Sequence, residues 1–123
     1  MKKSLIIIFL VIVVLAIAVF GFNITEKATD TPGEYDEFAQ CLTTEGAKLY
    51  GSFQCSHCKT QKEMFGNSIQ YVNYVECGPL RGPIDSKCID AGIEAYPSWI
   101  INETTYKGTQ SLSKLSDLTG CAL

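Results

Sequence analysis

The feature that most constrains the fold is the motif C-S-H-C, in which Cys55 and Cys58 lie one helical turn apart. A strand-like segment, 47–53, runs directly into the motif, and a helical pattern over 56–65 follows it. At a helix start, unpaired N–H groups and the helix dipole favour an anion, here a thiolate at Cys55. His57 adds positive charge or a hydrogen-bond donor, which favours the thiolate further and makes a Cys55–Cys58 disulfide a better oxidant.

A purely structural disulfide and metal chemistry are the alternatives for the same motif. A zinc site would need two more ligands at comparable spacing, but Cys77 and Cys88 are eleven residues apart and His57 is the only histidine. Haem attachment requires a histidine directly after the second cysteine, where Lys59 stands. A copper-binding or copper-delivery module, with Met64 as a further weak ligand, therefore stays open beside redox chemistry.

An unbroken apolar run covers residues 5–22 and follows a basic start at Lys2 and Lys3. As a helix it would span roughly 27 Å, close to the hydrocarbon thickness of a bilayer. We therefore expect one N-terminal transmembrane helix that anchors the chain in a membrane. A cleaved signal peptide is the alternative, because A-I-A at 16–18 offers a small-x-small pattern. Either way the rest of the chain is expected on the extracytoplasmic side (periplasmic or extracellular), and it would be secreted after cleavage.

The rest of the chain is acidic. After Lys2 and Lys3 it carries eight Lys and Arg against thirteen Asp and Glu, a net charge of −5, so no nucleic acid partner is expected. Residues 23–33 are polar, with Thr, Asp, Pro and Gly, which is typical of a linker. Residues 34–123 then form one domain, of a size at which the core is modest and covalent cross-links are useful.

Periodicity in this domain predicts the order helix, strand, helix, strand, helix, hairpin, helix. The first helix would be capped by Thr31, with Pro32 at its first position and Glu34 completing a capping box, and would end near Glu45. One face of that helix is expected to be buried: Tyr35, Phe38, Ala39 and Leu42. The later elements are expected at 71–76, 85–91, 98–101, 104–107 and 111–119. This order predicts an α/β domain with a mixed central sheet flanked by helices.

The region from Phe38 to Cys121 resembles the thioredoxin-like family. It is most similar to the thioredoxin-like domain that is fused to or paired with bacterial vitamin K epoxide reductase homologues. The matching segments are L-Y-G at 49–51, C-S-H-C at 55–58, Y-V-E-C at 74–77 and A-G-I-E-A-Y-P-S-W at 91–99. The C-x-x-C motif alone is weak, but its combination with G-I-E-A-Y-P-S-W, which begins 37 residues after Cys55, is strong.

The resemblance implies a thioredoxin-like fold and thiol–disulfide exchange with exported proteins, with no cofactor beyond the Cys55–Cys58 disulfide and no metal. Pro97 would be the cis-proline opposite that disulfide, and the Tyr96 backbone would pair with a substrate chain. Trp99 would border the same groove or lie in the core. The resemblance also suggests that a separate membrane oxidase of the vitamin K epoxide reductase type, which passes electrons to quinone, reoxidises the pair.

The sequence departs from the family's pattern before and within the motif. Gln54 stands where tryptophan is usual, and Ser56 where proline is common. Thioredoxin has a buried acid six residues before its first cysteine, and Leu49 occupies that position here. The missing acid removes a proton acceptor that assists reductases, so with His57 it favours an oxidase or isomerase over a reductase.

The other four cysteines are expected to form two structural disulfides, although six cysteines allow fifteen pairings. Cys41, on the first predicted helix, and Cys121, beyond the last, would tie the two ends of the domain together. Cys77 and Cys88 would pin the loop between them. In the alternative hypothesis, Cys77 and Cys88 form a second redox pair that exchanges electrons with Cys55–Cys58.

Overall fold

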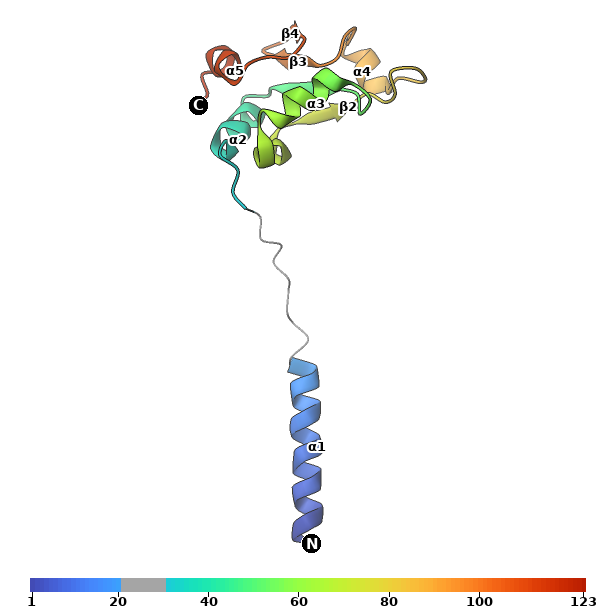
Figure 1. Cartoon of the computed structure of the whole chain (residues 1–123), viewed down its shortest axis with the longest axis vertical. Coiled ribbons are helices and arrows are strands. Elements are labelled where there is room, and N and C mark those ends of the chain that lie inside the picture. Colours follow the sequence, from blue (N-terminus) through green and yellow to red (C-terminus); the bar gives the residue numbers. More distant parts are fainter. Residues whose placement is uncertain (21–30) are drawn as a thin grey trace. The chain divides into compact units, whose positions relative to one another are not determined.

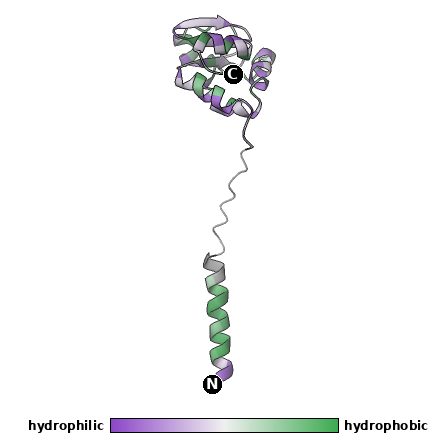
Figure 2. Cartoon of the chain, turned by 90° about the vertical axis from the view of Figure 1, so that its left-hand side faces the viewer, coloured by the Kyte–Doolittle hydropathy of each residue, from purple (hydrophilic) through white to green (hydrophobic). Residues whose placement is uncertain are grey.

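The chain forms two compact units in a computed structural model that describes residues 1–20 and 31–123 (Figure 1). The first unit, Met1–Asp30, contains helix α1 (Lys2–Phe20). Beyond its N-terminal lysines, the part of α1 that is coloured in Figure 2 is hydrophobic. Large apolar side chains from Leu5 to Leu15 are exposed on it.

The predicted transmembrane helix is wrong. Among the residues that the structure describes, none of the helices combines the length and the apolar character needed to cross a bilayer. The last two residues of the predicted span, 21 and 22, and most of the predicted linker, 23–30, lie outside the described residues.

The second unit, Thr31–Leu123, is built on a mixed four-stranded sheet with the order β2-β1-β3-β4. Its strands are β1 (Lys48–Gly51), β2 (Tyr74–Glu76), β3 (Ser98–Ile101) and β4 (Thr104–Lys107). β2 runs parallel to β1, whereas β3 is antiparallel to both β1 and β4. Asn102 and Glu103 close the β3–β4 hairpin with φ angles of 48° and 63°, as a two-residue turn that follows the sheet twist requires.

Four α-helices and one short 3₁₀ helix accompany this sheet in the described part of the second unit. They are α2 (Asp36–Thr44), α3 (Ser56–Glu63), η1 (Gly66–Tyr71), α4 (Ser86–Asp90) and α5 (Leu112–Thr119). Asp85 caps α4, and Ser111 caps α5 by accepting a hydrogen bond from the Lys114 N–H at 3.2 Å. η1 occupies the segment between the predicted helix at 56–65 and the predicted strand at 71–76, and β2 begins at Tyr74, three residues later than predicted.

The start of α2 also differs from the prediction. The helix begins at Asp36, and the carboxylate of Asp36 accepts hydrogen bonds from the Gly33 N–H at 3.0 Å and from the Ser68 hydroxyl at 2.7 Å. The Ser68 oxygen in turn accepts from the Tyr35 N–H at 3.0 Å. Ser68 is 32 residues away from Asp36 in the chain, so this tertiary contact replaces the expected local cap by Thr31.

The alternation of side chains along β1 and β3 places apolar residues on both faces of the sheet. One face carries Leu49, Trp99 and Ile101, which form one core cluster with Phe38, Leu42, Phe65 and Leu115. The other face carries Tyr50, Val75 and Ile100, which pack with Cys77, Cys88 and Ala91 around α4. The result is a small α/β domain with helices on both faces of a mixed sheet, compatible with a thioredoxin-like fold (Figure 1).

Candidate active site

Cys55 and Cys58 meet where β1 passes into α3. Cys55 is the N-cap of α3, with an extended backbone, and its Sγ accepts a hydrogen bond from the Cys58 N–H at 3.3 Å. Both cysteines are free thiols. Cys55 is 9% exposed and Cys58 only 1%, so Cys55 is the sulfur that a substrate can reach.

The Tyr96–Pro97 segment lies against Cys55. The peptide bond between Tyr96 and Pro97 is cis, and the Cys55 thiol donates to the Tyr96 carbonyl oxygen at 3.6 Å. Pro97 is buried, whereas Tyr96 is half-buried. The structure thus brings the backbone just before β3 next to the sulfur that would carry a mixed disulfide.

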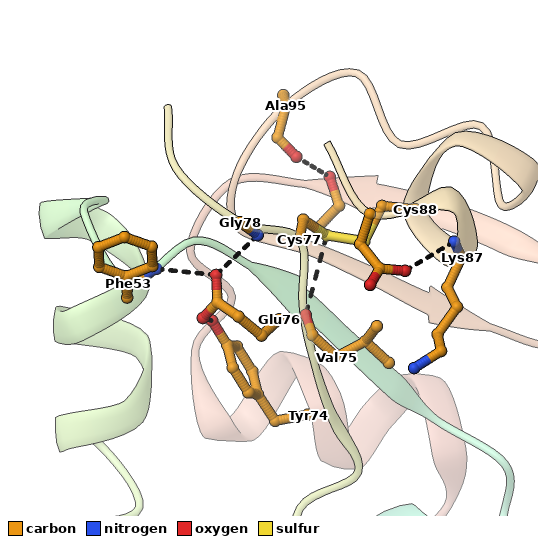
Figure 3. Close-up of a disulfide and its surroundings, with 11 residues drawn as sticks. Phe53, Tyr74, Val75, Glu76, Cys77, Gly78, Lys87, Cys88 and Ala95 are labelled. Atoms are coloured by element: carbon orange, nitrogen blue, oxygen red, sulfur yellow. Dashed lines mark hydrogen bonds between the residues drawn. A yellow bond between two sulfur atoms is a disulfide. The ribbon is translucent and has the colours of Figure 1, made fainter. Parts of the chain in front are cut away.

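Two disulfides support this arrangement. Cys41 on α2 is bonded to Cys121, with an S–S distance of 2.03 Å and a sequence separation of 80 residues. Cys77, directly after β2, is bonded to Cys88 on α4 across a separation of 11 residues (Figure 3). Cys77 and Cys88 are both fully buried, which keeps this bond out of reach of an external thiol.

His57 is exposed in the first turn of α3. Its backbone carbonyl accepts from the Thr109 hydroxyl at 3.4 Å. Within residues 31–123, the His57 ring makes no hydrogen bond to either thiol. The structure therefore places it beside the motif, with its side chain facing solvent.

Trp99 is completely buried, with its ring packed beside that of Phe65. Its indole N–H donates to the side-chain oxygen of Gln61 at 3.1 Å. The structure therefore places Trp99 in the core, and a substrate chain does not reach it. The alternation along β3 explains this placement, because Trp99 shares the inward face with Ile101.

Gln61 is a buried polar residue that the sequence reasoning missed. Its side-chain oxygen also accepts from the Gln110 N–H at 2.7 Å, and its amide group donates to the Gln110 carbonyl at 3.0 Å. It thereby ties α3 to β3 and to the segment before α5. The signal was present in the sequence, since Cys58, Gln61 and Phe65 share one helical face.

Similarity to a curated protein bears on this site. The chain is 47% identical over 90 residues to the thiol-disulfide oxidoreductase LTO1 of Arabidopsis thaliana, an alignment that covers 69% of this chain and 24% of that relative. The chain thus spans about a quarter of the length of the curated relative it matches. No protein-family model matches the chain. The relative is named a thiol-disulfide oxidoreductase, and the part of it that aligns with this chain is similar in sequence.

The Cys58 thiol has a raised pKa because of its surroundings. Burial, and then the hydrogen bond with Cys55, raise the pKa of the Cys58 thiol to about 12, against the opposing effect of the Lys62 charge. Cys58 is therefore a protonated thiol at neutral pH. A thiol–disulfide oxidoreductase must remove this proton whenever Cys58 attacks a disulfide and restore it whenever Cys58 leaves one.

Tyr74 and Glu76, at the end of β2, lie beside the motif although the sequence reasoning treated them only as strand residues. The Tyr74 hydroxyl donates to the Glu76 carboxylate at 2.8 Å, and the Lys62 ammonium lies 3.5 Å from the centre of the Tyr74 ring. Burial first, and then the hydrogen bond to Glu76, raise the pKa of Tyr74. The phenol is therefore neutral at physiological pH.

Across the described ranges 1–20 and 31–123, no group of three or more His, Cys, Asp and Glu residues is placed to hold a metal ion. The Met64 sulfur, counted above as a weak ligand, instead accepts from the Gln61 amide at 3.5 Å.

Proposed function

We propose that this chain exchanges disulfides with exported proteins through Cys55 and Cys58, as an oxidase or isomerase. The observation that carries the proposal is the asymmetry of the pair at the start of α3. Cys55 is the accessible sulfur beside the Tyr96 carbonyl, whereas Cys58 lies behind it and is sealed from solvent. This is the arrangement that an attacked sulfur and a leaving or resolving sulfur require.

In the oxidising direction a substrate thiolate attacks Cys55 Sγ in the Cys55–Cys58 disulfide. A bond forms between the substrate sulfur and Cys55, and Cys58 leaves with the electron pair and takes up a proton. A second substrate thiolate then attacks the substrate sulfur of the mixed disulfide, and Cys55 leaves as a thiolate. The substrate gains a disulfide, and two electrons rest on Cys55 and Cys58. The Tyr96 backbone lies against the mixed disulfide throughout.

The proposed location is an oxidising, extracytoplasmic compartment. The Cys41–Cys121 and Cys77–Cys88 bonds support this location, because such disulfides persist outside the reducing cytosol in most organisms. A domain of this size also gains stability from them.

The proposed partner is a separate quinone-linked membrane oxidase of the vitamin K epoxide reductase type, which takes the two electrons back. The resemblance of segments 49–51 and 91–99 to domains found with such oxidases supports it. Exposed apolar side chains flank the motif and provide a surface for docking. Phe53 is 67% exposed and Leu80 is 53% exposed. The Leu80 N–H donates to the Gln54 side chain at 3.0 Å, which holds the Leu80 loop beside Cys55.

The test is the reduction potential of Cys55–Cys58 in the purified full chain, measured by glutathione titration and alkylation trapping. An oxidase or isomerase is expected near or above about −180 mV. A value near about −270 mV would make the protein a reductase and overturn the proposed direction. Absence of exchange in the parent chain, with the Cys58→Ser variant indistinguishable from it, would overturn the redox role itself.

A further inference from the structure

Proton supply to Cys58 is the unsolved step in this site. Cys58 is 1% exposed, so water does not reach its sulfur freely. The chain position six residues before Cys55 holds Leu49, which is fully buried and has no proton to give or accept. The proton must therefore pass through another group that lies close to the Cys58 sulfur.

Tyr74 reaches that space from the neighbouring strand. It pairs with Leu49 in the parallel β1–β2 register. A Cβ built on Gly51 would lie 2.9 Å from the Cys58 sulfur and 3.1 Å from the Tyr74 hydroxyl oxygen. Both atoms therefore border the small space that the missing side chain of Gly51 leaves. The sulfur and the hydroxyl oxygen therefore lie at most about 6 Å apart, a separation that one water molecule can bridge.

Glu76 connects this space to solvent. One of its carboxylate oxygens accepts from the Tyr74 hydroxyl at 2.8 Å. The other accepts from the Phe53 N–H at 3.1 Å and the Gly78 N–H at 3.0 Å, so the carboxylate is fixed at three points (Figure 3). Glu76 is exposed, which lets it exchange protons with water.

The charged and titratable groups around the Tyr74 hydroxyl come from two elements. Cys55 is the N-cap of α3, Cys58 lies in its first turn and Lys62 in its last turn, and Glu76 belongs to β2 itself. The Lys62 ammonium over the ring favours a negative charge on the Cys58 sulfur, whereas the carboxylate of Glu76 is the base among these groups that solvent reaches.

We propose that Tyr74 and Glu76 form a proton relay between the Cys58 sulfur and solvent. This inference rests on the proposed thiol–disulfide exchange. When Cys58 attacks a mixed disulfide, its proton passes to the Tyr74 oxygen while the Tyr74 proton passes to Glu76. The bond between Cys58 and Cys55 forms, and the bond between Cys55 and the substrate breaks. The substrate sulfur leaves with the electron pair as a thiolate.

The same groups work in reverse when a substrate thiolate attacks the oxidised pair. Cys58 then leaves Cys55 with the electron pair and receives a proton from Tyr74, which recovers one from Glu76. The raised pKa of Tyr74 suits this role, because the phenol passes a proton on without remaining ionised. The relay therefore supplies the buried sulfur without an acid at position 49.

The test uses the reduced full chain and an aromatic disulfide that releases the coloured nitrothiobenzoate anion. Attack by Cys55 releases one anion and leaves a mixed disulfide, and attack by Cys58 on that bond releases a second. The two phases, followed in a stopped-flow instrument, separate the chemistry of the two sulfurs. Cys58→Ser identifies the second phase by removing it.

The diagnostic variants are Tyr74→Phe, which keeps the ring beneath Lys62, and Glu76→Gln, which keeps an oxygen for the Phe53 and Gly78 N–H groups. Each is expected to slow the second phase at least about tenfold at neutral pH and to leave the first phase unchanged. The rate of the second phase in the variants is expected to rise tenfold per pH unit, because hydroxide must then remove the proton. Tyr106→Phe and Glu103→Gln, at the opposite edge of the sheet, are the matched controls.

The two proposals fail in different ways. Equal second-phase rates and pH profiles in the parent, Tyr74→Phe and Glu76→Gln chains would overturn the relay and leave thiol exchange standing. A parent chain that never shows a second phase would overturn the proposed function and the relay with it. Loss of both phases in a variant that fails to fold is detected by its circular dichroism spectrum. In that case Tyr74→Trp, which also lacks the hydroxyl, decides by the same two criteria.

Discussion

The Cys55 sulfur accepts a hydrogen bond from the backbone N–H of Cys58 at 3.3 Å, so the accessible sulfur is held by the residue that follows it one turn later. This bond fixes the Cys55 sulfur against the first turn of α3. The two sulfurs thus differ in burial and in hydrogen bonding, which suits them to successive steps of an exchange reaction.

Cys58→Ser is expected to trap mixed disulfides between Cys55 and substrate proteins, because the resolving sulfur is gone and Cys55 stays accessible. The adducts are measured as bands on a non-reducing gel that disappear with dithiothreitol. Cys55→Ser is the control, since the buried Cys58 should form none. Equal adduct formation by both variants would contradict the assignment of Cys55 as the attacked sulfur.

The two structural disulfides are expected to contribute unequally to the free energy of unfolding. Replacing Cys41 and Cys121 by alanine removes an 80-residue link, and replacing Cys77 and Cys88 an 11-residue link. In the chain-entropy model these changes cost about 4 and about 3 kcal/mol respectively. Urea unfolding of the two double variants measures the difference, and a larger loss for the shorter link would contradict the entropic account.

The Cys77–Cys88 double variant also decides whether this pair takes part in electron transfer. A buried structural bond predicts that insulin-type disulfide exchange per folded molecule remains within about twofold of the parent chain. Activity is measured without urea, at a temperature at which circular dichroism shows that both proteins are fully folded. Loss of exchange activity in the folded variant would instead identify Cys77–Cys88 as a second redox pair.

Gln61→Leu is expected to lower the free energy of unfolding by about 2 to 3 kcal/mol. The change leaves the Trp99 indole N–H and the Gln110 backbone N–H buried without acceptors. Chemical denaturation followed by Trp99 fluorescence measures it. Gln70→Leu, at an exposed position in η1, is the matched control and should cost less than about 0.5 kcal/mol.

The raised pKa of Cys58 predicts a pH-dependent stability of the reduced protein. The pKa of the Cys58 thiol is about 8.5 in the unfolded chain and is raised to about 12 in the folded one. Below pH 8.5 both states hold the proton, so this contribution is complete. Above it the unfolded state alone loses the proton, and the stability falls as the pH rises towards the folded value. Urea unfolding at pH 8 and 10 should show this loss in the parent and not in Cys58→Ala.

Local patterns were sufficient for much of this fold. The β3–β4 hairpin and the helices α4 and α5 depend on residues within a few positions of one another, and the sequence predicts their bounds to within one residue. The start of α2 could not be predicted, because it depends on contact between Asp36 and Ser68 across 32 residues. The apolar run at 5–22 gave the wrong prediction of a membrane span, and its last two residues lie outside the described residues.

The candidate site also combines features that the sequence predicts with features that depend on tertiary structure. The spacing of Cys55 and Cys58 places both at one helix start, a local relationship. The approach of Tyr96 to Cys55 was predicted through the family resemblance. Tyr74 and Glu76 could not be anticipated, because their role depends on the parallel pairing of β2 with β1. The sequence offered only a strand pattern there, and a strand pattern does not say which thiol lies next to it.

Gly51 contributes to this domain by the atoms it lacks. A methyl group at this position would stand 2.9 Å from the Cys58 sulfur and 3.1 Å from the Tyr74 oxygen. It would separate the sulfur that takes part in electron transfer from the oxygen that is proposed to transfer its proton. At 2.9 Å the Cys58 sulfur would have to shift to admit that methyl group, so even the smallest added side chain would disturb both the redox pair and the proposed route of its proton.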